Sequence, residues 1–289
     1  MIYLKTFKLL NDYQEKKLTE IERRRIFNNY YPLGIFPLKE LEDIKFSNIT
    51  IFYGGNGSGK STLLNIISEK LEAQRKSPLD KGSFFDLYVE YCDFNMSYEY
   101  PLEIKLVTSD DVFEYLLDVR AINSRVNRTK EKLGKEYLNH KFSQDNTSFN
   151  NYQEVKDIYE SKTKSMSQYV RNRLMNNNII EKSNGESALL FWEQEIKDDS
   201  IYFLDEPENS LSAENQLKLK QFIEESARFY NCQFIISTHS PFLLDLEEAK
   251  IYDLDSFPVK NKSWSELENI KLYHEFFKER EDRFLEDEK

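Results

Sequence analysis

Residues 49–71 have the sequence ITIFYGGNGSGKSTLLNIISEKL, which carries the strongest local pattern in this chain. Its first five residues are β-branched or aromatic, which is typical of a buried strand. Four of the chain's eight glycines fall within residues 54–59. Beyond them, apolar side chains recur on one face of an expected helix, at Leu63, Leu64, Ile66, Ile67 and Leu71. The sequence therefore predicts a strand, a glycine-rich turn and a helix in direct succession.

Residues 54–61 fit the pattern G-x-x-x-x-G-K-[ST] in the strand–turn–helix context that a phosphate-binding loop requires. Glycines let backbone N–H groups point at phosphate oxygens, and the helix N-terminus adds its positive dipole end. Lys60 suits the β- and γ-phosphates, and the hydroxyl of Ser61 suits Mg²⁺. A chance match is rare in a chain so poor in glycine. The predicted nucleotide-binding residues of the loop are Gly54, Gly55, Asn56, Gly57, Ser58, Gly59, Lys60, Ser61 and Thr62.

The composition is that of a globular protein, with 39% hydrophobic and 31% charged residues in 289. No run of 18 apolar residues occurs, so we expect no transmembrane helix and no membrane contact. The first residues lack the apolar core of a signal peptide. Cys92 and Cys232 lie far apart in the sequence and form no metal-type pair, which fits core thiols in a reducing compartment. We therefore expect a cytoplasmic protein.

The charge is unevenly distributed. The chain carries a net charge of -11, yet residues 120–173 contain 12 Lys or Arg against 6 Asp or Glu, a net charge of +6. A solvated helical arm is the simpler interpretation of this segment. Contact with nucleic acid through residues 120–173 is the alternative.

The rest of the chain indicates an α/β body with an inserted helical subdomain. Residues 83–94 and 100–109 are predicted to be strands, whereas residues 112–180 contain one glycine and no proline and are predicted to be mostly helical. We expect a mostly parallel sheet flanked by helices. The expected parts are the N-terminal core (1–109), the inserted subdomain (110–182), the C-terminal core (183–258) and a helical tail (259–289).

A second motif, IYFLDEPENSLS, occupies residues 201–212. Four apolar residues predict a strand that ends at Asp205 and Glu206, and ligands bind at this end of the strands in open α/β sheets. Asp205 suits a Mg²⁺ partner, usually through water. Glu206 suits a base that polarises an attacking water. Many strands end in this way, so the motif gains its meaning from the glycine loop.

Two further motifs complete the set. FIISTHSPFLLD, residues 234–245, predicts a buried strand that brings His239 to the same edge, where it would contact the γ-phosphate. A lone histidine is more often structural. SNGES, residues 183–187, places the Ser183 hydroxyl and the Gly185 N–H at a helix N-terminus, which favours an anion site. An ordinary helix cap is the competing interpretation.

The order of these motifs resembles the ABC-type ATPase head of the P-loop NTPase fold, over about residues 30–255. Within that group the chain looks most like compact, soluble bacterial AAA-family ATPases related to SMC-like and nuclease-associated heads. The resemblance implies ATP and Mg²⁺ as cofactors, with Ser61 and Asp205 as metal ligands. It implies that the catalytic residues are Glu206, His239 and Lys60. It also puts Ser183, Gly185 and Glu186 on signature positions that bind the nucleotide.

The chain departs from the family pattern at several positions. Lys182 and Asn184 replace the usual Leu and first Gly of the signature, and Ser212 stands where many members have the Asp of the D-loop. No Gln ends the strand predicted at residues 100–109. The open candidates are Asp110 or Asp111 for the Q-loop position and Tyr30 or Tyr31 for stacking on adenine.

The resemblance implies a homodimer with ATP at the interface, in which the signature of one chain meets the phosphate loop of the other. ATP hydrolysis would then switch a cytosolic protein partner, such as a nuclease or toxin-type effector in an antiviral defence module. An ATP-dependent scaffold or sensor with little hydrolysis and an ATP-gated nucleic-acid clamp are the alternatives. A transporter subunit is disfavoured by the long polar insertion. A P-loop kinase would leave Glu206 and His239 without roles.

Overall fold

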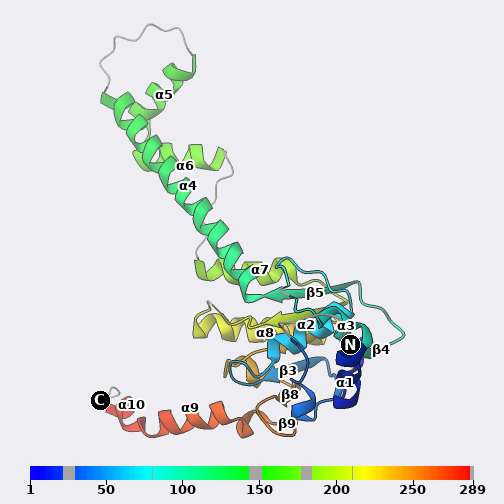
Figure 1. Cartoon of the computed structure of the whole chain (residues 1–289). Helices are drawn as coiled ribbons and strands as arrows, with labels where there is room; N and C mark the ends of the chain where they lie inside the picture. The colour runs from blue at the N-terminus through cyan, green and yellow to red at the C-terminus, as the bar shows by residue number, and fades with distance from the viewer. Residues whose placement is uncertain (22–29, 80, 143–151, 177–183, 210, 287–289) are drawn as a thin grey trace. The chain divides into compact units, whose positions relative to one another are not determined.

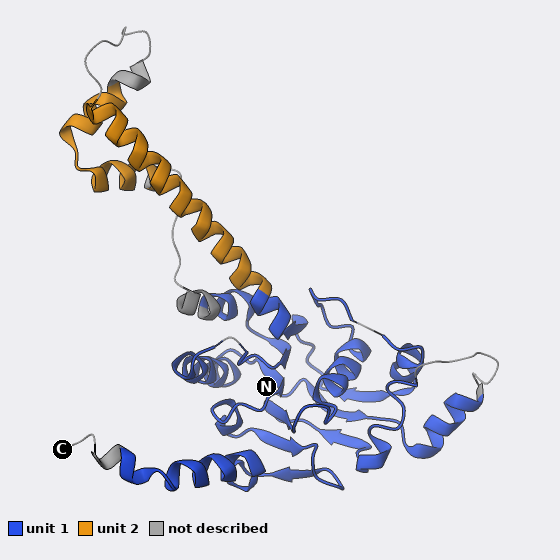
Figure 2. Ribbon diagram, turned by 60° about the vertical axis from the view of Figure 1, so that its left-hand side comes forward, with its two compact units in different colours: residues 1–113, 189–289 blue, residues 114–188 orange. Residues whose placement is uncertain are grey.

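The computed structural model describes residues 1–21, 30–79, 81–142, 152–176, 184–209 and 211–286. These residues form two compact units, which are coloured separately in Figure 2. The first unit consists of residues 1–113 and 189–289, and the second of residues 114–188. The first unit carries the glycine loop and both strand-end motifs.

A six-stranded sheet with the order β5-β6-β7-β3-β8-β9 forms the centre of the first unit (Figure 1). Its first five strands are parallel, and β9 runs antiparallel to β8. This arrangement confirms the predicted α/β fold with a mostly parallel sheet. The strands are β3 (Ile49–Tyr53), β5 (Glu103–Thr108), β6 (Ser200–Asp205), β7 (Gln233–Ser237), β8 (Lys250–Asp253) and β9 (Lys260–Lys262).

The three strands that carry the motifs end level with one another. In the sheet register, Ser237 of β7 pairs with Asp205 of β6 on one side and with Phe52 of β3 on the other. Strand β7 therefore separates the strand of the glycine loop from the strand of the acidic pair. Because all three strands are parallel, their carboxyl ends present the motifs at one edge of the sheet.

A smaller antiparallel sheet, with the order β2-β1-β4, packs in the same unit. Its strands are β1 (Leu4–Lys8), β2 (Asp43–Lys45) and β4 (Asp93–Met96). Helix α3 (Phe85–Tyr91) precedes β4, so the strand predicted over residues 83–94 is wrong for most of its length. Phe85, Tyr88 and Val89 are all buried, and their spacing of three and four residues is that of a helix face.

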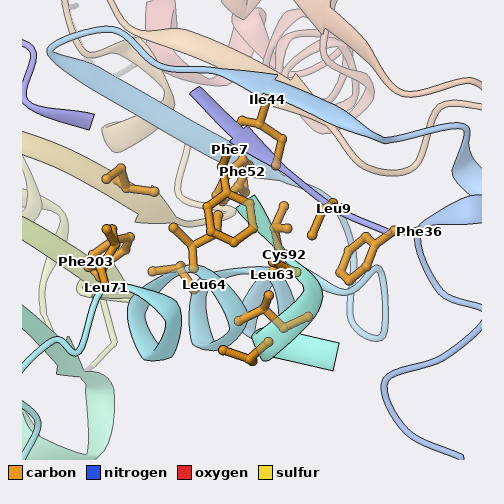
Figure 3. Close-up of a cluster of buried hydrophobic side chains, with 14 of the residues drawn as sticks. Phe7, Leu9, Phe36, Ile44, Phe52, Leu63, Leu64, Leu71, Cys92 and Phe203 are labelled. Atoms are coloured by element: carbon orange, nitrogen blue, oxygen red, sulfur yellow. The ribbon is translucent and has the colours of Figure 1, made fainter. Parts of the chain in front are cut away.

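The core lies between the two sheets and helix α2 (Lys60–Lys70), as Figure 3 shows. Phe7, Phe52 and Leu64 from these three elements are at most 1% exposed. Along β6 the side chains alternate, so Phe203 joins this cluster while Tyr202 points to the other face and stacks on Phe234 at 5.8 Å between ring centroids. Helix α8 (Ala213–Phe229) packs against β7. The motif-bearing strands are thus buried on both faces, which explains their continuous apolar runs.

The first unit also contains α1 (Asp12–Ile21), most of α7 (Asn184–Glu195), α9 (Glu268–Lys278), α10 (Glu281–Glu286), and the 3₁₀ helices η1 (Pro37–Lys39), η2 (Leu243–Asp245) and η3 (Trp264–Glu266). Helix α9 buries Ile270 but exposes Leu272, Phe276 and Phe277. None of the helices in the described ranges has the length and apolar character needed to cross a membrane.

The second unit consists of most of α4 (Ser109–Phe142) together with α5 (Tyr152–Thr163) and α6 (Met166–Asn176). Tyr137 of α4 meets Tyr169 of α6 edge to face, with ring centroids 5.3 Å apart. The guanidinium of Arg173 lies 3.7 Å from the Tyr169 centroid and pairs with Asp157 of α5. Aromatic and charged contacts therefore hold the three helices together.

Glu15 is a buried acid of α1 whose ionisation opposes folding. It is 6% exposed, accepts a hydrogen bond from the Gly34 N–H at 2.6 Å, and burial raises its pKa from 4.5 to about 7. The folded chain therefore holds this proton more tightly than the unfolded chain. The contribution of this proton to the free energy of unfolding is fully present below pH 4.5 and is lost as the pH rises through 7.

We predict that Glu15→Gln removes this pH dependence. At pH 8 the variant should be more stable than the wild type by on the order of 2 kcal/mol, with little difference at pH 4. Urea unfolding at both pH values measures the effect, and the exposed Glu42→Gln is the matched control. Equal stability of wild type and variant at pH 8 contradicts the prediction.

Candidate nucleotide-binding site

In the glycine loop between β3 and α2, neighbouring atoms leave little room for a Cβ at two positions. A Cβ at Gly54 would lie 2.6 Å from the Ser58 hydroxyl oxygen. Gly59, which precedes α2, has φ +98°, and a Cβ there would lie 3.2 Å from the Ile35 side chain. Both positions therefore require glycine. Gly55, Asn56 and Gly57 are exposed at the tip of the loop.

The loop wraps around the amine of Lys60, which is 5% exposed. Its Nζ donates to the carbonyl oxygens of Gly54 at 2.9 Å and Gly55 at 3.2 Å. The N–H of Gly55 is held from outside by the carboxylate of Asp255 at 2.7 Å. Asp255, which follows β8, was not among the predicted residues. Its signal in the sequence is only an acid after a short apolar run.

Ser61 and Asp205, the predicted metal ligands, lie side by side. The Ser61 hydroxyl donates to Oδ1 of Asp205 at 3.0 Å, and the Ser237 hydroxyl donates to the same oxygen. Burial raises the pKa of Asp205, and the two hydroxyl bonds oppose that shift. A carboxylate and a hydroxyl are the oxygen ligands that Mg²⁺ accepts when nucleotide phosphates complete its shell. In the described ranges no cluster of three His, Cys, Asp or Glu forms a separate metal site.

Glu206 occupies a strained position next to the other site residues. Its φ is +49°, in the left-handed region that non-glycine residues avoid, and strain of this kind concentrates at functional sites. Its Oε1 lies 3.8 Å from the Lys60 Nζ and 3.7 Å from Nδ1 of His239. Its Oε2 accepts a hydrogen bond from the Asn209 amide at 3.0 Å. The structure thus brings together the acid, lysine and histidine that three separate motifs predict.

Two residues that contact this group were not predicted from the sequence. Asn209 holds Glu206, and Glu208 is buried beneath the turn that carries His239. Both lie in the run DEPEN, residues 205–209, where an additional acid two residues after Glu206 is the available signal.

The Q-loop candidates differ in their surroundings. Asp111 is 4% exposed and accepts hydrogen bonds from the Ser77 hydroxyl at 2.6 Å and the Thr108 N–H at 2.8 Å. Its carboxylate therefore holds the start of α4 in place. Asp110 is exposed.

The two aromatic candidates also differ. The Tyr31 hydroxyl lies 3.1 Å from the Thr62 hydroxyl, within hydrogen-bonding distance, and the Tyr31 ring stacks on Phe85 with centroids 6.1 Å apart. Tyr30 is 57% exposed. Of the two, Tyr30 has more surface left for a nucleotide base.

The predicted signature is placed only in part. Ser183 lies outside the described residues, and Gly185 and Glu186 belong to the first turn of α7. All three stay predictions. Ser212, at the position of the D-loop Asp, is the N-cap of α8 and accepts a hydrogen bond from the Asn215 N–H at 3.4 Å.

The fold and this site define a P-loop nucleotide-binding domain. A family model described as ABC transporter matches residues 42–209, and one described as AAA ATPase domain matches residues 185–244. Because the first match spans more than half of the chain, the chain belongs to that family. Its first unit is an ABC-type ATPase head, and the resemblance drawn from the motifs is confirmed.

Curated relatives are similar over different lengths. The chain is 23% identical over 277 residues to the tungstate uptake system ATP-binding protein TupC of Campylobacter jejuni, covering 89% of this chain and 73% of the relative. It is 34% identical over 96 residues to the small ribosomal subunit biogenesis GTPase RsgA of Enterococcus faecalis. That match covers 31% of this chain, and it spans only 32% of the GTPase.

Solved structures are similar at low identity. The Smc head domain derived from Pyrococcus furiosus matches at a TM-score of 0.39 and 14% identity, over 96% of this chain and all of that one. A nucleotide-free ATP-binding cassette from an ABC transporter matches at a TM-score of 0.37 and 15% identity, over 88% of both chains. The fold assignment rests on the sheet described above.

We predict that Asp205→Asn and Ser61→Ala each raise the Mg²⁺ concentration needed for half-maximal nucleotide binding, by at least about tenfold, because each removes an oxygen ligand or its charge. Fluorescent ATP titrated at fixed Mg²⁺ concentrations measures the effect. Asp86→Asn, at a carboxylate that is 75% exposed, is the matched control. An unchanged Mg²⁺ requirement in both site variants contradicts the assignment.

Proposed function

We propose that this chain is an ATPase that binds Mg-ATP, dimerises head to tail around it, and hydrolyses it to switch a cytosolic protein partner. The main observation in support of the proposal is that Lys60 and His239 both approach Glu206. Its Oε1 lies within 4 Å of both the Lys60 amine and the His239 imidazole, although the three residues come from different strand ends.

In the proposed reaction, Glu206 accepts the proton of the attacking water, and its 26% exposed side chain is open to solvent. Lys60 supplies positive charge to the β- and γ-phosphates, and His239 contacts the γ-phosphate. When bound between Ser61, Asp205 and the phosphates, Mg²⁺ would neutralise phosphate charge. Asn209 holds one oxygen of Glu206, which leaves the other oxygen to face the water.

We expect Glu206→Gln to lower the ATP turnover number by at least about 100-fold, because the amide cannot accept the proton, while ATP binding is kept. Phosphate release measures turnover, and fluorescent ATP measures binding. The exposed Glu214→Gln is the matched control. If the wild type and Glu206→Gln hydrolyse ATP equally slowly, the assigned catalysis is wrong, and an ATP-dependent scaffold or sensor becomes the better proposal.

The proposed dimer would place Ser183, Gly185 and Glu186 of one chain against ATP on the loop of the other. We expect Glu206→Gln to change from monomer to dimer in ATP but not in ADP, because blocked hydrolysis traps the closed state. Light scattering after size exclusion measures the mass. A second change, Gly185→Asp, should abolish the dimer by adding negative charge opposite the phosphate, whereas Lys60→Ala should abolish ATP binding itself. A mass that is independent of nucleotide contradicts the prediction.

A protein partner is supported by α9, where Leu272, Phe276 and Phe277 are 62%, 49% and 54% exposed. Exposed apolar groups of this kind mark contact surfaces. We propose a nuclease or toxin-type effector of an antiviral defence module as the partner class, because the family resemblance points to it.

A nucleic-acid clamp is the second candidate, favoured by the net charge of +6 over residues 120–173. The same turnover assay separates the two candidates. Stimulation by duplex DNA or RNA that falls steeply with salt supports the clamp, whereas turnover that is insensitive to nucleic acid supports the protein partner.

A further inference from the structure

Glu208 holds the turn that carries His239. We call residues Thr238–Ser240, directly after β7, the switch turn. The Oε1 of Glu208 accepts hydrogen bonds from the Thr238 hydroxyl at 2.6 Å, the His239 N–H at 3.1 Å and the Ser240 N–H at 3.3 Å. One carboxylate oxygen therefore binds all three residues of the switch turn, across about 30 residues of sequence.

This carboxylate is costly to bury. Glu208 is 5% exposed, and burial raises the pKa of its carboxyl group, an effect opposed by the hydrogen bonds from Thr238 and His239. Its second oxygen, Oε2, is buried and accepts no hydrogen bond from the described part of the chain. An unpaired buried oxygen destabilises a fold by about 1–3 kcal/mol.

The position of Glu208 relates it to the proposed reaction. Nδ1 of His239 lies 3.8 Å from Oε1 of Glu208 and 3.7 Å from Oε1 of Glu206. The imidazole Nδ1 is thus within 4 Å of both the acid proposed to accept the proton of water and the acid that binds the backbone of His239. At the ends of the two strands, the N–H of Glu206, directly after β6, donates to the carbonyl oxygen of Ser237, the last residue of β7, at 2.9 Å. The loop after β6 is therefore hydrogen-bonded to the end of β7 through Glu206 and to the switch turn through Glu208.

We propose that Glu208 is a positioning residue of the ATPase reaction, which fixes the switch turn so that His239 faces both Glu206 and the γ-phosphate. The inference rests on the proposed function and adds a residue that none of the motifs assigned. Glu208 acts through the backbone of His239 and the hydroxyl of Thr238. A misplacement of about 1 Å at a reacting group costs on the order of 100-fold in rate, so a loosened turn lowers turnover.

Two substitutions at Glu208 separate positioning from charge. In Glu208→Gln the amide oxygen can still accept the three hydrogen bonds, whereas Glu208→Ala removes the acceptor. We expect Glu208→Ala to lower kcat by about 30-fold or more with the KM for ATP changed by less than about threefold. Glu208→Gln should recover most of kcat. The exposed Glu214→Ala is the control for a Glu-to-Ala change in the same unit.

A second readout does not depend on hydrolysis. The chain has three histidines, His140, His239 and His274, so ring signals in an NMR spectrum of histidine-labelled protein are assigned with His239→Gln. We expect the His239 signal to move in Glu208→Ala and to stay close to the wild-type position in Glu208→Gln. Thr238→Val, which removes one of the three bonds and keeps the side-chain shape, should move it in the same direction and serves where Glu208→Ala unfolds.

The outcomes are distinct. Wild-type kcat in Glu208→Ala together with an unmoved His239 signal overturns the inference. Equal losses of kcat in the Ala and Gln variants also overturn it, because the hydrogen-bond geometry would then not be the property that matters. If the wild-type chain fails to hydrolyse ATP, the proposed function is wrong, and the His239 signals still show whether Glu208 sets the position of the imidazole.

Discussion

Oδ1 of Asp205 accepts hydrogen bonds from two hydroxyls of different elements, Ser61 on α2 and Ser237 on β7. This shared oxygen fixes the phosphate loop relative to the acidic pair, although β7 separates their strands. Its geometry depends on the parallel register in which Ser237 pairs with both Asp205 and Phe52. Sliding one strand by a residue would turn every side chain to the opposite face and dissolve the site.

The parts of the fold that followed from the sequence are those with a strong local pattern. The strands β3, β6 and β7 are buried on both faces, so each is a nearly continuous apolar run. Helix α3 was missed because its aromatic run is short, and a short apolar run fits a strand as well as a helix. The presence of Phe85 and Tyr88 in one buried cluster is decided by the tertiary fold.

The site residues also divide into those that a local pattern predicts and those that it does not. Lys60 and Ser61 were found because the phosphate loop requires a fixed local spacing, and Glu206 was found because it follows an apolar strand in a chain that has this loop. Asp255 and Glu208 were missed because their roles come from contacts with distant residues, 200 positions away for the Gly55 N–H and 30 for the Thr238 hydroxyl. No local pattern encodes such a contact, and a single sequence shows only that an acid follows an apolar run.

Energetic cost is concentrated at the carboxyl edge of the sheet, whereas the core is a cluster of buried apolar side chains (Figure 3). Glu206 has φ +49°, and Glu208 keeps an unpaired buried oxygen. Local inconsistency of this kind is expected where geometry serves function. The Lys60 amine is held by loop carbonyls and lies 3.8 Å from Glu206. Under the proposed function, the phosphates of ATP would compete with the Glu206 carboxylate for the Lys60 amine. ATP binding would then release Glu206 from Lys60, so that the carboxylate could act on water.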